Sequence, residues 1–267
     1  MKKEANLFLR LLIRLGEQAS TLVSNVWGIT KLVLDVLVNL PRSPFRWRET
    51  IHQMKVIGVE TVPLILVTMA VVGSIIVIEL RYQLMRLIHT ADWTPGFAGI
   101  FFLREAGTAV VGAMVASRAG AGMAAEVGTM QITDQVDALK LLRANPVHYL
   151  VVPRFIACTL MTMALSVTGV ACCVIVGYLF VMDVHNFMSY VETMRKFVGI
   201  RDFLVIFEKS FFFGMAIPII SCYYGFQARG GAQGVGTATT RAVVYSILAV
   251  ILLDFLLTGA TQVVSQI

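Results

Sequence analysis

The chain has 267 residues, of which 57% are hydrophobic and only 14% are charged, with a net charge of +6. Soluble globular domains are typically about 45–50% apolar and about 25% charged, and the mean hydropathy of +0.79 is far more apolar. This composition excludes a disordered chain, a coiled coil and an ordinary soluble enzyme. Because the apolar residues gather in long runs, it indicates an integral membrane protein.

The first 48 residues differ from the rest, because they show the pattern of an amphipathic helix. The apolar face comprises Phe8, Leu12, Leu15, Ala19, Leu22 and Val26, and the polar face comprises Arg10, Arg14, Glu17 and Thr21. This pattern predicts a helix lying in the membrane interface; packing on the bundle is the alternative. The arginines interrupt the apolar run, which argues against a signal peptide. A basic, proline-containing connection at residues 41–48 follows.

Residues 49–267 contain five segments long enough to cross a membrane, which takes roughly 20 mostly apolar residues. We expect spans at about residues 61–80, 93–117, 155–182, 208–228 and 242–264. Alternating strand patterns are absent, which argues against an outer-membrane barrel. The sequence therefore predicts an all-α integral membrane protein, with an N-terminal interfacial helix and a transmembrane domain of five helices.

Lysine and arginine are distributed unevenly around these spans. With the N-terminus in the cytoplasm, 15 of the 22 cations lie on the cytoplasmic side, six lie outside, and Arg104 lies within a span. Positive charge concentrates in cytoplasmic loops, so we expect a cytoplasmic N-terminus and a C-terminus on the other side. The net charge then reflects topology and contact with anionic lipid, with no role in nucleic-acid binding.

Three charged residues lie near the middle of predicted spans: Arg104 and Glu105 in the second and Asp254 in the fifth. Each costs roughly 2.5–3.5 kcal/mol at the centre of a membrane helix, so such residues face the protein interior or a wet cavity. Adjacent residues point about 100° apart on a helix. We therefore expect Arg104 to pair with Asp254 while Glu105 faces a cavity; a purely structural ion cluster is the alternative.

The connection between the second and third spans is polar and carries a second amphipathic pattern. Ile132, Val136 and Leu139 form an apolar face, which predicts a short helix at about residues 131–144. Asn145-Pro146 ends it, because the residue before proline is disfavoured in the helical region. On the basic side of the membrane, such a helix suits docking to a cytoplasmic partner; lying on lipid is the alternative.

The sequence predicts no catalytic residue, no metal site and no cofactor of its own. The four cysteines lie in apolar spans without a Cys-x-x-Cys pair, the four histidines are scattered, and the glycine-rich loop at residues 230–236 lacks the ending of a phosphate-binding loop. Driven transport would therefore require an ATPase in another subunit.

Several separated motifs resemble the MlaE/YrbE-type permease family. In order, they are LREAG at 103–107, SRAG at 117–120, AEVGTM at 125–130, TDQVDAL at 133–139, NP at 145–146, YLVVPR at 149–154, TATTR at 237–241 and LDF at 253–255. The similarity covers roughly residues 50–265. Thr108 and Ser117 depart from the family pattern, which usually has proline and glycine at these positions.

The resemblance implies the permease subunit of an ABC transporter that moves lipids, with phospholipids expected, between the bacterial inner membrane and the outer envelope. It implies a homodimer, a cytoplasmic ATPase dimer that holds ATP and magnesium, a hexameric MCE-domain substrate-binding protein and often a STAS-domain protein. Such systems serve outer-membrane lipid asymmetry. The alternatives from other classes are a scaffold that anchors an MCE protein without transport, and a membrane-embedded lipid-modifying enzyme.

The same resemblance assigns expected roles to individual residues. Arg104, Glu105 and Asp254 would belong to a charged layer at the lipid cavity. The helix that receives the ATPase stroke would include Thr133, Asp134, Gln135, Val136, Asp137, Ala138, Leu139 and Lys140. The cytoplasmic motifs contribute Arg118, Glu126, Arg154 and Arg241. Arg81 and Arg86 make the outer end of the first span basic, which suits either anionic headgroups or anchoring of the helix end.

Overall fold

The computed structural model describes residue 20 and residues 23–40 and 46–266, and these residues form helices and connections without strands. Within them, five helical segments are long and apolar enough to cross a membrane. This confirms the prediction of an all-α integral membrane protein with five spans.

The spans are longer than the apolar runs that predicted them. The first combines α2 (Trp47–Ile57), the turn η1 (Val59–Thr61) and α3 (Val62–Ile88). The second combines α4 (Thr94–Phe101), η2 (Phe102–Ala106), α5 (Gly107–Val115), η3 (Ala116–Gly120) and α6 (Ala121–Ile132). The third is η4 (Val147–Val151) with α8 (Val152–Tyr178), the fourth is α10 (Ile200–Phe226) and the fifth is α11 (Gly231–Gln266).

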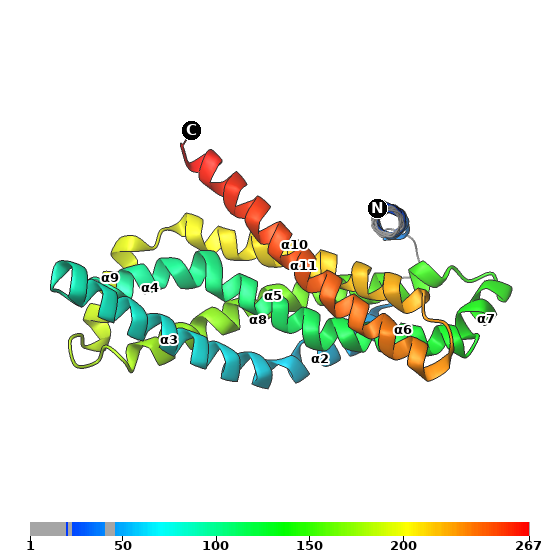
Figure 1. The fold of residues 1–267 in the computed structure, drawn as a ribbon, viewed down its shortest axis with the longest axis horizontal. Helices are drawn as coiled ribbons and strands as arrows, with labels where there is room; N and C mark the ends of the chain where they lie inside the picture. The colour runs from blue at the N-terminus through cyan, green and yellow to red at the C-terminus, as the bar shows by residue number, and fades with distance from the viewer. Residues whose placement is uncertain (1–19, 21–22, 41–45, 267) are drawn as a thin grey trace, which may run out of the picture.

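Two short helices mark the ends of the bundle (Figure 1). The helix α7 (Gln135–Leu141) follows the second span, and α9 (Phe187–Phe197) precedes the fourth. We call these ends the α7 end and the α9 end. The second span has 39 residues. At about 1.5 Å per residue it is roughly twice as long as the hydrocarbon core is thick, so it extends into the polar region.

The third span, α8, is the central helix, and it packs against α3 on one side and α10 on the other. Small residues allow these contacts. A Cβ added to Gly214 of α10 would lie 2.6 Å from the Thr159 Cα of α8, and one added to Gly73 of α3 would lie 2.9 Å from the Cys173 Cα. Membrane helices gain packing energy from this close approach of backbones.

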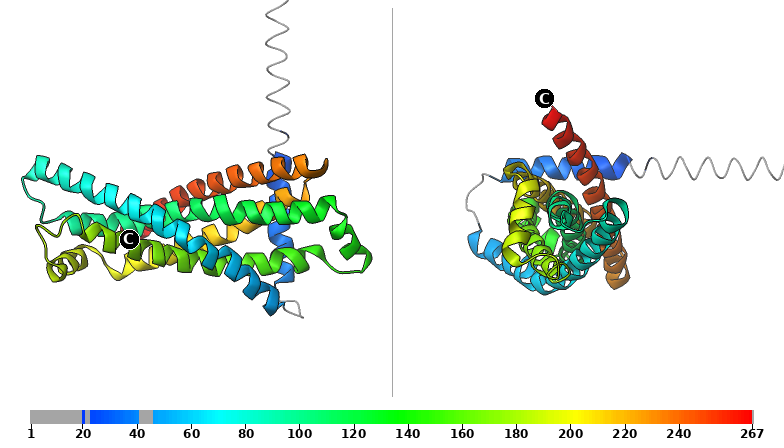
Figure 2. Two further views of the ribbon diagram at one scale, coloured as in Figure 1. Left: turned by 90° about the horizontal axis from the view of Figure 1, so that it is seen from below. Right: turned by 90° about the vertical axis from the view of Figure 1, so that its left-hand side faces the viewer.

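The last helix, α11, belongs only partly to the bundle. Its first half lies along α6 and α10, Asp254 and Thr258 still contact the bundle, and its C-terminal end projects away from the other helices (Figures 1 and 2). Leu252, Phe255 and Leu256 are consequently exposed. An apolar surface of this kind is covered by lipid or by another chain.

A helix at residues 23–39 crosses the bundle near the α7 end (Figure 2). Leu32 and Val36 are buried against the bundle, whereas Trp27, Leu34 and Val38 are exposed. The helix thus combines packing on the bundle with an apolar outer face. Residues 1–19, 21 and 22, which carry most of the predicted amphipathic pattern, lie outside the described residues.

The helix expected at residues 131–144 is interrupted. α6 continues to Ile132, and α7 covers only Gln135–Leu141. Between them Asp134 adopts a left-handed conformation, with φ of 58°, which short polar side chains tolerate better than most. Val136 is buried as predicted, but the exposed end of α7 presents Leu141 and Leu142.

Candidate functional site

A cluster of charged side chains lies where the second, fourth and fifth spans meet. It is centred on η2, a π-helical turn inserted into the second span, which carries Arg104 and Glu105. Single π turns inside α-helices are often associated with functional sites. The cluster joins them to residues of α10 and α11 that lie about 100 to 150 positions further along the chain.

Lys209 of α10 is the centre of the cluster. Its side chain is only 1% exposed, and its Nζ lies 2.9 Å from Asp254 Oδ1 and 3.3 Å from Glu105 Oε2. The ammonium also donates to the Arg104 carbonyl oxygen at 2.5 Å. One buried cation thus has two carboxylates and a carbonyl as partners, which compensates the cost of removing its charge from water.

Arg104 makes a separate pair at the edge of the cluster. Its Nε donates to Asp202 Oδ1 at 2.5 Å, with the aspartate side chain 4% exposed and the arginine 51% exposed. The other oxygen of Asp202 accepts from the Gly199 backbone N–H at 2.7 Å and so caps the start of α10. The expected pairing of Arg104 with Asp254 is therefore wrong. Arg104 pairs with Asp202, and Asp254 pairs with Lys209.

The sequence did not reveal Asp202 and Lys209 as partners, because Asp202 lies before the fourth predicted span and Lys209 lies at its very start, ahead of the uncharged run that begins at Ser210. α10 begins at Ile200, eight residues before the predicted start at 208. Asp202 and Lys209 are seven residues apart, so they lie on the same face two turns apart. This spacing, directly before an uncharged run, is the signal that would have found them.

Glu105 is the least enclosed carboxylate of the cluster. It accepts from Thr258 of α11 at 3.4 Å, and its side chain retains 36% exposure. The cluster contains two cations and three carboxylates and so carries formally one negative charge. That Glu105 faces a lipid cavity stays a prediction.

A second set of polar contacts ties the helices together toward the α7 end. Arg118, on the second π turn η3, donates to the Val56 carbonyl at 3.1 Å, to Thr61 Oγ1 at 2.7 Å and to Glu60 at 3.2 Å. It thereby fixes the bend between α2 and α3 against the second span.

Arg154 makes the equivalent link between the second and third spans. It is buried, and it donates to the Leu150 carbonyl at 2.7 Å and to Glu126 Oε2 at 2.8 Å. Arg241, the remaining residue of the expected cytoplasmic motifs, is exposed on α11.

The residues expected to form the coupling helix all lie at the α7 end. Val136 is buried, Lys140 pairs with Asp137 at 2.7 Å on the exposed face, and Gln135 donates to Thr133 at 3.1 Å. Asp134 and Ala138 are exposed and Leu139 is half-buried. A role for this helix in coupling stays a prediction.

Several contacts connect the segment after α7 to the N-terminal region, and the sequence did not suggest them. After α7, Asn145 donates to Asn39 Oδ1 at 3.2 Å, and His148 Nδ1 lies 3.2 Å from the Asn39 carbonyl. Arg46, before α2, lies over the Tyr149 ring, 3.5 Å from its centre, and donates to the Tyr149 carbonyl at 3.3 Å. The end of helix 23–39, the start of α2 and η4 thus meet at one junction.

The amino-acid sequence that forms this bundle and its charged cluster is similar to that of known proteins. A family model described as permease MlaE matches residues 50–260. The chain belongs to the MlaE permease family. The match includes parts of all five spans, the whole charged cluster and α7, but it does not include Asn39 and Arg46 of the junction.

Relatives of the permease carry names of the same kind. A probable ABC transporter permease protein of Synechocystis is 34% identical over 83% of this chain and 85% of its own length. One from Rickettsia bellii is 31% identical over 91% of this chain and 95% of its own. The chloroplastic protein TRIGALACTOSYLDIACYLGLYCEROL 1 of Arabidopsis thaliana is 31% identical over 84% of this chain and 64% of its own.

Proposed function

We propose that this permease is the membrane subunit of an ABC transporter that moves lipids, with phospholipids as the expected substrate. The observation that carries the proposal is the Lys209 cluster, which places a buried ion network in an apolar bundle, beside a helix whose apolar side is uncovered. Acyl chains and a charged headgroup require these two surfaces next to each other. The name of the Arabidopsis relative contains that of a glycolipid, which is in keeping with a lipid substrate.

The uncovered half of α11 suggests where the lipid would lie. Asp254 and Thr258 face the cluster, and Leu252, Phe255 and Leu256 are exposed on the same two turns. In the proposed arrangement a second copy of the permease covers this surface, and the lipid lies between the copies. Glu105, which is partly exposed, would meet its headgroup.

The α7 end is the proposed docking site for the ATPase, which would place it in the cytoplasm and the α9 end on the outer side of the bacterial inner membrane. Leu141 and Leu142 are exposed beside the charged pair of Asp137 and Lys140, and exposed apolar residues with a polar rim are typical of protein interfaces. ATP and magnesium would bind in the ATPase, an MCE-domain protein would meet the α9 end, and a STAS-domain protein would be an optional partner. The permease itself would perform no covalent chemistry.

Purification from the native membrane followed by reconstitution tests the proposal. We expect the permease to co-purify with an ATPase and an MCE-domain protein, and we expect lipid to stimulate ATP hydrolysis. Lys209→Met should reduce lipid transport at least tenfold, and Leu160→Ala, at an exposed position within α8, should leave it unchanged. A permease that binds the MCE protein but no ATPase would instead be a scaffold.

The docking site has its own test. Asp137→Lys should lower the lipid-stimulated ATPase activity or the affinity for the ATPase while leaving the folded permease intact, because Asp137 is exposed and pairs only locally. Transport at the wild-type rate in this variant would remove Asp137 from the coupling role.

A further inference from the structure

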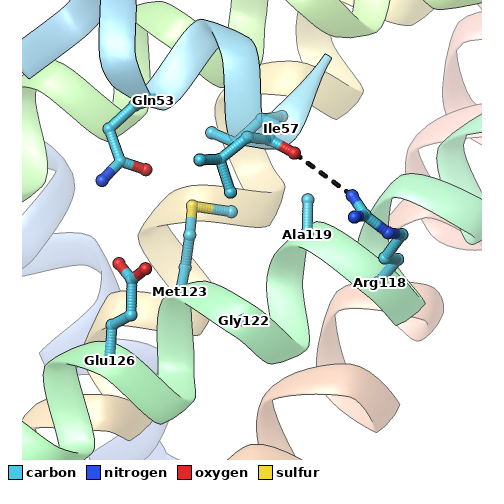
Figure 3. A pocket seen from close by; sticks show the side chains of 8 residues that line it. Gln53, Ile57, Arg118, Ala119, Gly122, Met123 and Glu126 are labelled. Carbon is cyan, nitrogen blue, oxygen red and sulfur yellow. Dashed lines mark hydrogen bonds between the residues drawn. The ribbon is translucent and has the colours of Figure 1, made fainter. Parts of the chain in front are cut away.

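A groove lies between α2 and the second span, away from the Lys209 cluster. Its volume is about 160 Å³, and it is lined by Gln53, Val56, Ile57, Arg118, Ala119, Gly122, Met123 and Glu126 (Figure 3). Sites that enclose a drug-sized molecule have volumes of roughly 300 Å³ or more. The groove is therefore large enough for a headgroup but not for acyl chains.

The groove has a charge of opposite sign at each end. Arg118, Gly122 and Glu126 follow at intervals of four residues, so they share one face of the helix, with the Cα atoms of the two charged residues about 12 Å apart along its axis. A Cβ at Gly122, in the middle, would meet no atom within 4 Å. The space between the charged side chains is therefore open.

Both charged groups retain capacity for another partner. Three acceptors contact Arg118, and a guanidinium carries five N–H donors. Glu126 accepts from Arg154 through Oε2, which leaves Oε1 as an acceptor. The amide of Gln53 points toward Glu126 across the groove (Figure 3), and its Nε2 is directed to Glu49. One end thus offers donors to an anion, and the other offers acceptors to an ammonium.

The position of the groove fits the boundary between hydrocarbon and headgroups. Residues 106–117 of the second span carry no charge, and Arg118 is the first ionisable residue after them. On the other wall, α2 exposes His52 and Lys55, while Ile57 and Met123 form a buried apolar floor. A ligand here would have polar atoms at the groove and apolar atoms in the bilayer.

We propose that this groove binds the headgroup of a zwitterionic phospholipid, with the phosphate at Arg118 and the ammonium at Glu126. An anionic headgroup would meet the Glu126 carboxylate, and a purely cationic one would meet the Arg118 guanidinium. The site is distinct from the proposed transport cavity, since it lies beyond an uncharged stretch of the second span and involves α2. It would fix the bend between α2 and α3 to the surrounding leaflet.

Native mass spectrometry of the purified full-length permease, titrated with defined lipids, tests the site. We expect phosphatidylethanolamine to bind at least tenfold more tightly than phosphatidylglycerol or diacylglycerol. Gly122→Leu, which fills the groove, should abolish one bound phosphatidylethanolamine. Gly236→Leu is the matched control, because Gly236 also lies in a helix with no atom within 4 Å of an added Cβ, and it should bind as the wild type does.

A second variant keeps the test decisive if Gly122→Leu folds poorly. Glu126→Gln retains an oxygen for Arg154 but removes the negative charge, so the preference for phosphatidylethanolamine over phosphatidylglycerol should fall about tenfold. Unchanged stoichiometry in Gly122→Leu, or unchanged preference in Glu126→Gln, would overturn the proposal. Equal binding of soluble phosphoethanolamine would overturn the assignment to a membrane lipid. None of these results depends on whether the permease transports lipid.

Discussion

The second span carries two π turns that hold polar networks of similar design but different burial. At η2 the central cation is Lys209, which is 1% exposed and lies between two carboxylates. At η3 it is Arg118, which is 35% exposed, and its partner Glu60 is 48% exposed. Removing one partner of a buried ion pair costs about 3–5 kcal/mol, whereas exposed pairs contribute about 0–1 kcal/mol. A π turn therefore supports a strongly stabilising ion network at η2 and a weakly stabilising one at η3.

The largest expected effect comes from Lys209→Met, which leaves Glu105 and Asp254 without their shared cation. We expect the free energy of unfolding in detergent to fall by about 3–5 kcal/mol. Lys196→Met, an exposed control, should change it by less than about 0.5 kcal/mol. Adding Asp254→Leu to Lys209→Met should recover part of the loss, because it removes one of the unpaired charges. A loss below 1 kcal/mol for Lys209→Met would show that the two networks are energetically alike.

The partner of Arg104 can be decided by double-mutant cycles. Arg104→Met with Asp202→Asn should show a coupling energy of about 0.5–3 kcal/mol, the range for residues in contact. Arg104→Met with Asp254→Asn should couple more weakly, because Lys209 is the partner of Asp254. Stronger coupling in the second cycle would restore the pairing that the sequence first suggested.

The sequence predicted the spans well and the charged network only in part, for a physical reason. Runs of about 20 apolar residues identify membrane helices without knowledge of their neighbours. The same criterion places Asp202 in a loop and Lys209 at the very edge of the fourth span, because it counts every charge as a cost. Paired inside the bundle, these charges are compatible with the first turns of α10. Arg104, Glu105 and Asp254 were found since they interrupt apolar runs, but their partners depend on packing.

Other features could not be predicted from the sequence because they depend on local backbone geometry or on contacts between distant residues. The π turns at η2 and η3 have no apolar periodicity that distinguishes them from α-helix. The break at Asp134 depends on a left-handed conformation that a helical pattern does not reveal. The contact of Arg46 with Tyr149 joins residues 103 positions apart. Each required the fold before it could be recognised.

At the exposed ion pair of Arg118 and Glu60 near η3, we expect a smaller change in stability. Glu60→Gln removes the charge that pairs with Arg118 but leaves the hydrogen bonds of Arg118 to Thr61 and the Val56 carbonyl. The free energy of unfolding should fall by less than about 1 kcal/mol, and the difference should shrink at high salt because surface pairs are screened. A loss as large as that of Lys209→Met, insensitive to salt, would mean that η3 is as enclosed as η2.

The smallest effect is expected at a third ion pair at the α9 end, which joins Arg81 near the end of α3 to Asp183 in the connection between α8 and α9. Arg81 Nη2 lies 2.5 Å from Asp183 Oδ2, and the same guanidinium donates to the Phe180 carbonyl at 2.9 Å. The hydrogen bond from Arg81 holds the pKa of Asp183 below its usual value. Because the folded-state pKa is the lower one, the pair stabilises the fold above the unfolded value of about 3.9, and this contribution is lost as the pH falls through the folded-state pKa.

Thermal unfolding of the wild type and of Asp183→Asn at several pH values measures this contribution. The two melting temperatures should differ slightly at pH 7 and converge below about pH 4. Both groups are substantially exposed, so the difference should be smaller than that of Glu60→Gln and should also decline with salt. Melting temperatures that stay apart in acid would assign the stabilisation to the geometry of the loop. Convergence would assign the stabilisation to the ion pair, so that Arg81 would anchor the end of α3. The stability losses at Lys209, Glu60 and Asp183 would then follow the burial of their ion pairs.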